Sequence, residues 1–342
     1  MSKVLVTGGC GYIGSHTLVD LINHGFNVIS ADNHLNSDPS VLEGVETITG
    51  KKVKNYAIDL CNLEETRRIF IENPDIKGII HFAALKAVGE SVEKPLLYYH
   101  NNLVSLLNIL TCIEDFNIKN LIFSSSCSVY GNAKELPVTE KTPLQTAESP
   151  YARTKQIGED MLKDFALVHP FVNIIALRYF NPAGAHESAI IGESPINIAS
   201  NLVPVITETA IGKRAETVVF GDDYPTRDGS CIRDYIHVMD LANAHTKSLE
   251  YVINHKNTDN YELFNLGIGE GVSVLEAVKA FEKANGIQFK YRIGPRRPGD
   301  VVAVYANNIK AKNRLGWTPQ RSIEDIMRTA WNWEKQRSQV PA

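Results

Sequence analysis

Cysteine is scarce in this 342-residue sequence, and the few cysteines follow no familiar pattern. There are five, Cys10, Cys61, Cys112, Cys127 and Cys231, an odd number with wide and irregular spacing. This spacing argues against a disulfide framework and against a zinc site, and it favours free thiols in a reducing compartment. The ten histidines also lack the spacing of metal ligands, so the sequence predicts no metal.

An excess of charge and a long apolar segment are also lacking. Lysine and arginine together number 35 and aspartate and glutamate 39, giving a net charge of −4, which disfavours a protein that coats nucleic acid or a membrane surface. No run of about 18 apolar residues occurs, and the chain begins with strand-like residues rather than a basic segment followed by an apolar one. We therefore expect a cytoplasmic protein with no nucleic-acid or membrane partner.

What the sequence does contain is an alternation of short apolar runs and helical patterns. Hydrophobic residues make up 44% of the chain and charged residues 22%, as in folded globular proteins. Strands that are apolar throughout are buried on both faces, which is typical of a parallel sheet covered by helices. The sequence thus predicts the α/β class, with a doubly wound parallel sheet in residues 1–180. The expected strands are 3–7, 26–31, 55–59, 78–83, 120–126 and 172–180, and the expected helices are 12–24, 63–71, 96–116 and one that begins at Pro150.

Residues 181–342 have longer connections and more isolated elements, which predicts a smaller mixed α/β lobe that binds substrate. Ligands of open α/β sheets bind at the carboxyl ends of the strands, so the cleft between the two parts should lie there. Segment 235–267 is a candidate for packing back on the first domain. The expected helices are 198–211, 238–253, 273–285 and 322–335, and the expected strands are 217–220 and 262–266.

A glycine-rich turn follows the first expected strand. Residues 8–14 read GGCGYIG, with glycines at positions 8, 11 and 14. Glycines permit a tight turn and a close approach of the backbone to a pyrophosphate, whose charge the N–H groups of the next helix can bind. Because this turn lies between a strand and a helix, it matches the Rossmann dinucleotide-binding fingerprint.

Two aspartates end the next expected strands. Asp32 lies 18 residues after Gly14, where a carboxylate accepts hydrogen bonds from the adenosine ribose and repels a 2′-phosphate. We therefore predict NAD rather than NADP. Asp59 is a candidate for binding the adenine, and a helix cap is an equally good interpretation of it.

Two Tyr-x-x-x-Lys patterns occur, at Tyr130/Lys134 and at Tyr151/Lys155. Spaced in this way on a helix, the two side chains share a face, and the ammonium, together with a positive nicotinamide ring, would lower the pKa of the tyrosine so that it can act as a base. Tyr151 follows Pro150, which favours the start of a helix, whereas Tyr130 precedes a loop-like segment. We therefore assign the base to Tyr151.

Three serines, Ser124 to Ser126, end the fifth expected strand. One of these hydroxyls can relay a proton between the substrate and the tyrosine. For Ser124 and Ser125 we favour the simpler interpretation that they cap the turn.

Together these features resemble the extended short-chain dehydrogenase/reductase superfamily and, within it, the UDP-galactose 4-epimerase family. The matches run through the whole chain in order: TGGCGYIGSH at 7–16, HFAALKAVGES at 81–91, SSSCSVYG at 124–131, SPYARTK at 149–155, LRYFNPAGAH at 177–186, RDYIHVMDLA at 233–242 and RRPGD at 296–300.

The resemblance implies roles for many residues. Tyr151 would be the base, Lys155 its partner and Ser126 the hydroxyl relay. Arg233 and Arg297 suit a diphosphate, although for Arg233 an ion pair with Asp234 or another carboxylate is the structural alternative. The residues implied to bind NAD are Gly8, Gly11, Tyr12, Ile13, Gly14, Asp32, Asn33, Asn36, Asp59, Leu60, Phe82, Ala83, Lys86, Asn101, Tyr151, Lys155 and Phe180. Those implied to bind the UDP-sugar are Lys86, Ser126, Asn181, Asn201, Leu202, Phe220, Arg233, Tyr235, Arg297, Asp300 and Val304.

The implied activity is the interconversion of UDP-glucose and UDP-galactose through a 4-keto intermediate, with NAD held as a prosthetic group. Related sugar-nucleotide 4,6-dehydratases carry an Asp-Glu pair where this chain has Cys127 and Ser128, so a dehydratase ranks second. A non-catalytic NAD-binding regulator is a third alternative, which would not need Tyr151, Lys155 and Ser126 together.

The family also implies a homodimer, and it draws attention to Val304. Members limited to non-acetylated sugars carry a tyrosine at this position, four residues after Asp300. A small residue here predicts that UDP-GlcNAc and UDP-GalNAc are accepted as well. Because Tyr305 is adjacent, a shift of one residue in the alignment would reverse this inference.

Overall fold

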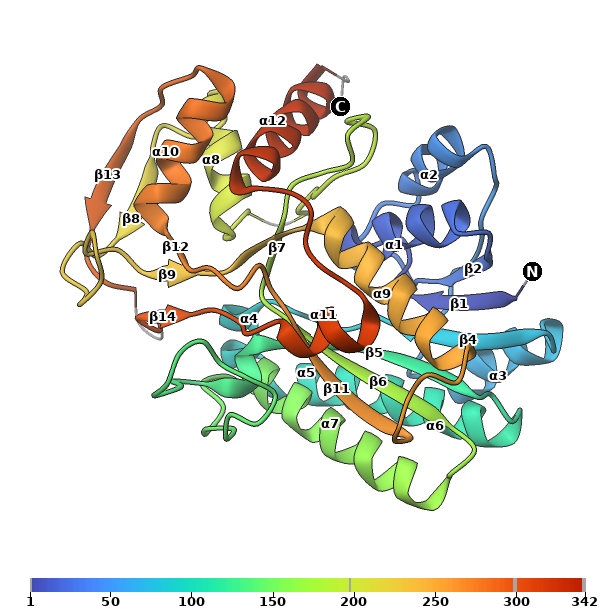
Figure 1. Cartoon of the computed structure of the whole chain (residues 1–342). Coiled ribbons are helices and arrows are strands. Elements are labelled where there is room, and N and C mark those ends of the chain that lie inside the picture. Colours follow the sequence, from blue (N-terminus) through green and yellow to red (C-terminus); the bar gives the residue numbers. More distant parts are fainter. Residues whose placement is uncertain (1, 197, 298–299, 340–342) are drawn as a thin grey trace.

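The computed structural model describes residues 2–196, 198–297 and 300–339, and its centre is a seven-stranded parallel sheet (Figure 1). The strand order is β11-β6-β5-β4-β1-β2-β3. This arrangement confirms the predicted fold class. The strands are β1 (Lys3–Thr7), β2 (Asn27–Ala31), β3 (Lys54–Tyr56), β4 (Ile76–His81), β5 (Asn120–Ser126), β6 (Asn173–Tyr179) and β11 (Tyr261–Leu266).

Helices cover both faces of this sheet, and each face has its own hydrophobic core. On one face α1 (Tyr12–Asn23), α2 (Val41–Thr49) and α9 (Val238–Ile253) pack against the strands. On the other face lie α3 (Leu63–Glu72), α6 (Ser105–Asp115) and α7 (Pro150–Val168). The continuous apolar runs of the strands follow from this burial on two sides.

The helix expected over residues 96–116 is present, and it contains a π-helical turn that the sequence analysis did not anticipate. The structure divides this region into α5 (Pro95–Tyr99), a π-helical turn (His100–Val104) and α6, with α4 (Val88–Glu93) before them. The buried Asn102 lies in the π turn, where its side chain accepts from Leu85 N at 2.8 Å and donates to Leu85 O at 3.0 Å. The side chain in this turn thus satisfies a backbone N–H and C=O group of the loop that follows β4. This long-range contact leaves no sign in the helical periodicity of the sequence.

The rest of the chain forms a smaller lobe with its own core, drawn at the upper left of Figure 1. Its helices are α8 (Leu202–Ala210), α10 (Val274–Asn285) and α12 (Ile323–Gln339), so the helix expected at 198–211 begins only at Leu202. Short sheets pair β7 (Asn181–Ala183) with β10 (Tyr235–His237), β8 (Thr217–Phe220) with β13 (Tyr291–Gly294), and β9 (Ile232–Arg233) with β12 (Val272–Ser273) and β14 (Ala303–Val304). Helix α11 (Ile309–Leu315) packs beside β11.

Two elements from the second half of the chain, one strand and one helix, are part of the first domain. Strand β11 pairs with β6 along its whole length, from Tyr261 opposite Ile174 to Leu266 opposite Tyr179. Helix α9 packs on α1. The chain is therefore not cleanly divided at residue 180, and the assignment of one ligand to each part stays a prediction.

Within the described ranges, no helix is both long enough and apolar enough to span a bilayer. The same residues contain no group of three or more histidine, cysteine, aspartate or glutamate side chains placed to hold a metal ion.

Candidate active site

A large cleft lies where the carboxyl ends of the strands meet the smaller lobe. Its volume is about 2160 Å³. Every residue predicted to bind cofactor or substrate lines it, from the glycine turn to Asp300 and Val304. The fold thus brings together residues that are nearly 300 positions apart in the sequence.

The glycine turn is tight enough to exclude side chains. A Cβ atom at Gly14 would lie 2.1 Å from the carbonyl oxygen of Gly8, and one at Gly8, whose φ is +68°, would lie 2.9 Å from the amide nitrogen of Ala83. Helix α1 begins after Gly11 with no side chain capping it, so N–H groups of its first turn are free to bind a phosphate. These features fit the pyrophosphate of a dinucleotide.

Asp32 holds the turn in place. Its Oδ2 accepts a hydrogen bond from Cys10 N at 3.0 Å, and its Oδ1 accepts from His34 N at 2.9 Å and Ser37 Oγ at 2.8 Å. Asp59 does not cap α3, because Asn62 accepts from the first N–H groups of that helix. Instead, Asp59 lines the cleft and accepts from Cys61 N at 2.9 Å.

Tyr151 and Lys155 lie on the first turns of α7, whose N-terminus is capped by Ser149. Lys155 is 5% exposed, and its Nζ donates to Ser124 O at 2.7 Å and lies 5.9 Å from the centre of the Tyr151 ring. The other tyrosine of this pattern, Tyr130, is fully buried and donates to Asn265 Oδ1 at 2.6 Å. It does not line the cleft, so the geometry favours Tyr151.

Burial dominates the electrostatics of this pair in the absence of a cofactor. Burial raises the pKa of Tyr151 to about 12, and the neighbouring Ser126 hydroxyl opposes this shift only in part. Burial also lowers the pKa of Lys155 to about 8. The predicted lowering of the tyrosine pKa includes a bound nicotinamide and stays a prediction; without the cofactor, the cost of burying a phenolate outweighs the help of the neighbouring hydroxyl.

The interpretation of Ser124 and Ser125 as turn caps is also wrong. The Ser124 hydroxyl forms a hydrogen bond with the Tyr179 hydroxyl. The Ser125 hydroxyl donates to Glu159 Oε1 at 2.5 Å. Ser126 does accept from Ser128 N at 3.2 Å, so it is the serine that caps the following turn, while its hydroxyl lies beside Tyr151.

Arg233 and Arg297 meet at one carboxylate in the smaller lobe. The Nη2 atoms of Arg233 and Arg297 lie 3.3 Å and 2.7 Å from Asp300 Oδ1. Asp234 is not the partner of Arg233, because it accepts from backbone N–H groups, among them Ile268 N at 2.8 Å and Ala306 N at 3.0 Å. Two guanidiniums that share one acid carry an excess positive charge toward the cleft, which suits a diphosphate.

Val304, the last residue of β14, and Tyr305, which follows it, point to opposite sides of the chain. Val304 lines the cleft and packs in a cluster with Val129 and Phe180. Tyr305 contacts the opposite side, where a Cβ atom on Gly271 would lie 3.0 Å from its ring. The residue that faces the cleft is therefore the valine.

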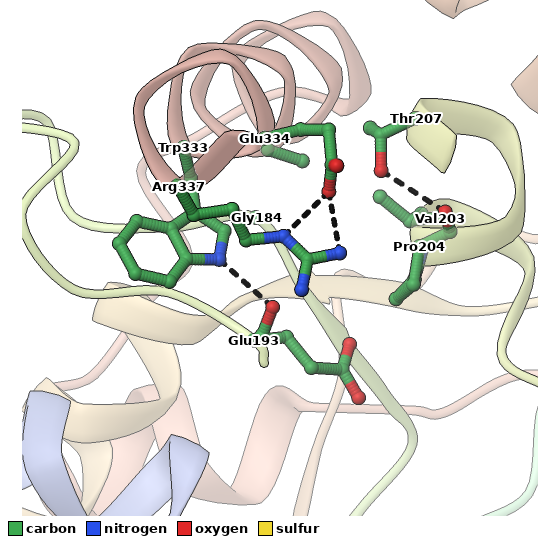
Figure 2. Close-up of a pocket in the computed structure, with 9 residues that line it drawn as sticks. Gly184, Glu193, Val203, Pro204, Thr207, Trp333, Glu334 and Arg337 are labelled. Atoms are coloured by element: carbon green, nitrogen blue, oxygen red, sulfur yellow. Dashed lines mark hydrogen bonds and ion pairs between the residues drawn. The ribbon is translucent and has the colours of Figure 1, made fainter. Parts of the chain in front are cut away.

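Glu193 was missed by the sequence reasoning. Its Oε1 accepts from Asn201 Nδ2 at 3.0 Å and lies 3.6 Å from Lys86 Nζ, so it joins two predicted ligand-binding residues across the cleft. Figure 2 shows that the indole of Trp333 on α12 anchors the backbone of Glu193, at 2.8 Å. The small cavity in this view measures about 10 Å³, room for roughly one water molecule, whereas the large cleft has room for a larger ligand.

Comparisons with known proteins agree with this geometry. A family model described as GDP-mannose 4,6 dehydratase matches residues 5–330. The chain is 47% identical over 332 residues to a UDP-glucose 4-epimerase of Haemophilus influenzae, and the match covers 97% of each chain. It is similar to the crystal structure of UDP-glucose 4-epimerase from Bifidobacterium longum in complex with NAD+ and UDP, with a TM-score of 0.93 and 48% identity over 98% of this chain and 99% of that one. A UDP-glucose 4-epimerase from Stenotrophomonas maltophila with bound NAD and formylated UDP-arabinopyranose gives a TM-score of 0.95 and 42% identity, covering 99% of both chains.

Proposed function

Since the chain belongs to the family of UDP-glucose 4-epimerases, we propose that it interconverts UDP-glucose and UDP-galactose, using NAD held in the same cleft. This family membership confirms the resemblance drawn from the sequence motifs. The observation that carries the proposal is the continuity of one cleft from the glycine turn, past Tyr151 and Lys155, to Arg233 and Arg297. A dinucleotide at one end and a nucleotide sugar at the other would meet at the tyrosine.

The residues around the glycine turn, Asp32 and Lys155 would hold the cofactor. When bound, the nicotinamide supplies reversible removal of hydride from the sugar and a positive ring beside the tyrosine. Tyr151 takes the proton from the C4 hydroxyl of the sugar as the 4-keto sugar forms, and Ser126 relays that proton where the hydroxyl lies out of direct reach. Arg233 and Arg297 anchor the diphosphate while the 4-keto sugar turns its other face, so that binding energy remote from C4 retains the intermediate.

A 4,6-dehydratase is the second candidate, because the family model that matches the chain carries that description. Dehydration needs an acid and a base next to the sugar ring, and this chain has Cys127 and Ser128 at the positions of the Asp-Glu pair. Burial raises the pKa of the Cys127 thiol to about 12, so it does not replace a carboxylate near neutral pH. The site therefore favours epimerisation.

An assay without added cofactor tests the proposal. We expect denatured, purified protein to release about one NAD per chain, and native protein to convert UDP-galactose to UDP-glucose with no net NADH. A stable 4-keto-6-deoxy product would favour the dehydratase. Protein that contains NAD but converts neither sugar nucleotide would favour the non-catalytic regulator.

We infer that the cleft also accepts N-acetylated UDP-sugars, because the small Val304 side chain leaves room for an acetamide group. Replacing Val304 with tyrosine should lower kcat/KM for UDP-GlcNAc by at least tenfold, about 1.4 kcal/mol of transition-state binding, and change the value for UDP-glucose much less. The matched control is Tyr305→Phe, which alters a side chain on the opposite side of β14. Equal losses for both substrates in the Val304 variant would refute the steric argument.

We also propose a cytoplasmic homodimer. All five cysteines are free thiols, as expected in a reducing compartment. Exposed leucines on α5 and α6, among them Leu96 and Leu107, offer an apolar surface that a second copy would cover. Light scattering that gives the mass of one chain at micromolar concentration would refute the dimer, and recovery of the protein in a membrane or secreted fraction would refute the location.

A further inference from the structure

The middle serine at the end of β5 contacts a buried acid that has no assigned role. Ser125 pairs with Arg178 across β5 and β6, and both side chains contact Glu159 on α7. Glu159 is 0% exposed and Arg178 is 3% exposed. A buried ion pair therefore lies directly behind the end of β5.

Glu159 is held from two sides. Arg178 donates to it through Nε at 2.8 Å and Nη2 at 2.5 Å, and Ser125 Oγ donates at 2.5 Å. The Arg178 guanidinium also lies over the Tyr130 ring, 4.8 Å from its centre. Burying a carboxylate is costly unless it is paired and hydrogen-bonded, and here both conditions are met. The carboxylate is thus fixed in position.

Glu159 lies one helical turn after Lys155, so the two side chains share the face of α7 that covers β5. Among the described residues, the other groups in contact with the Lys155 ammonium or acting on it carry no negative charge. They are the Ser124 carbonyl, the Phe123 ring 5.0 Å away, the Tyr151 phenol and the buried His81 on β4, whose pKa burial lowers to about 3. Glu159 is the acidic group that acts on Lys155.

We propose that Glu159 is a positioning residue: held by Ser125 and Arg178, its carboxylate keeps the Lys155 ammonium charged and directed at the end of β5, next to Tyr151. This inference rests on the proposed function, since that function gives Lys155 its part in catalysis. Glu159 acts only through the lysine and touches neither ligand.

The proposal predicts how the activity of a variant without the Glu159 charge depends on pH. Burial already lowers the pKa of Lys155 to about 8, and the Glu159 charge acts in the opposite direction. Removing that charge lowers the lysine pKa further, so the ammonium is lost at a lower pH. The loss of activity on the alkaline side must then begin at a lower pH.

The test is the pH profile of kcat for Glu159→Gln, which keeps the shape of the side chain and one accepting oxygen but removes its charge. We expect the alkaline limb to move down by about one pH unit, which lowers kcat at pH 8.5 by about tenfold relative to wild type. At pH 6.5 the variant should recover most of its activity, since the lysine is protonated there. A purely structural role would lower kcat equally at both pH values.

Arg178→Gln is a second variant that tests the same idea through the partner of Glu159. Without the guanidinium the buried carboxylate is no longer compensated and its neutral form is favoured, so the alkaline limb should again move to lower pH. If the alkaline limb of the kcat profile lay at the same pH in the folded variants as in the wild type, the proposal would be overturned.

Glu334→Gln is the matched control. Figure 2 shows Glu334 on α12 bonded to Arg337, at 2.6 Å, and it also lies 2.9 Å from Lys213 Nζ. It is a buried acid paired with an arginine, like Glu159, but it lies in the smaller lobe. We expect its variant to lose thermal stability without moving the pH profile. Wild-type protein that fails to epimerise UDP-galactose would refute the proposed function, whereas active wild type with unmoved limbs in the variants refutes only the role of Glu159.

Discussion

Replacing Tyr151 with phenylalanine is expected to lower kcat for epimerisation by about 10²- to 10⁴-fold, the usual contribution of a positioned acid or base. The phenol lies at the edge of the cleft beside Ser126 and Lys155. Its described neighbours are less well placed to take the proton from C4: the Ser126 hydroxyl ionises less readily than a phenol, and Lys155 is bound to the Ser124 carbonyl. Steady-state kinetics with UDP-galactose measures the loss.

The pKa of Tyr151 explains why this effect should be large. The groups of the chain alone raise that pKa to about 12, so the free protein holds a neutral phenol at neutral pH. The positive charge of a bound nicotinamide acts in the opposite direction. Catalysis then depends on one hydroxyl whose ionisation is coupled to cofactor binding. Phenylalanine removes this hydroxyl and preserves the shape of the ring.

Tyr130→Phe is the matched control, because Tyr130 belongs to the other Tyr-x-x-x-Lys pattern. Its hydroxyl donates to Asn265 inside the protein, so its removal should cost about 0.5–1.5 kcal/mol of stability and leave kcat within a few-fold of wild type. A Tyr151→Phe variant that retains NAD and more than a third of the wild-type kcat would contradict the assignment of the base.

The sheet was predictable because its strands have a simple signal. Burial on two faces demands continuous apolar residues, and the strand 120–126 has the same bounds in the sequence analysis and in the structure. The π turn inside the helix at 95–115 was not predictable, since it depends on Asn102 satisfying the backbone of Leu85. Helical periodicity reports which face is buried, and it does not report which polar group a distant loop requires.

The site was predictable only where chemistry is local in the sequence. The glycine turn and the pair Tyr151/Lys155 each occupy a few consecutive residues. Glu159 escaped attention because its partners, Ser125 and Arg178, lie on two different strands, and their pairing is a matter of register. The choice between Val304 and Tyr305 had the same difficulty, since a shift of one residue in a strand exchanges the two faces.

Gly14→Ala is expected to have the second large effect, loss of bound NAD. The new Cβ would lie 2.1 Å from the carbonyl oxygen of Gly8 and 2.8 Å from the Cα of Gly9. Both are backbone atoms of the turn itself, so relief requires the turn and α1 to move apart. Overpacking of this kind costs about 1–3 kcal/mol of stability. It also displaces the N–H groups that would bind the pyrophosphate.

The measurement is NAD released on denaturation, which we expect to fall well below one per chain, together with at least a tenfold rise in the Kd for added NAD, equivalent to about 1.4 kcal/mol. Gly89→Ala on α4 is the control, because a Cβ there meets no atom within 4 Å; it should keep both the cofactor and the thermal stability. If purified Gly14→Ala retained one NAD per chain, the turn would not be the cofactor's phosphate site. The epimerisation rate should fall in proportion to the NAD lost. A prosthetic group returns to its starting state in each turnover, so its loss lowers the number of active sites and leaves the rate at each remaining site unchanged.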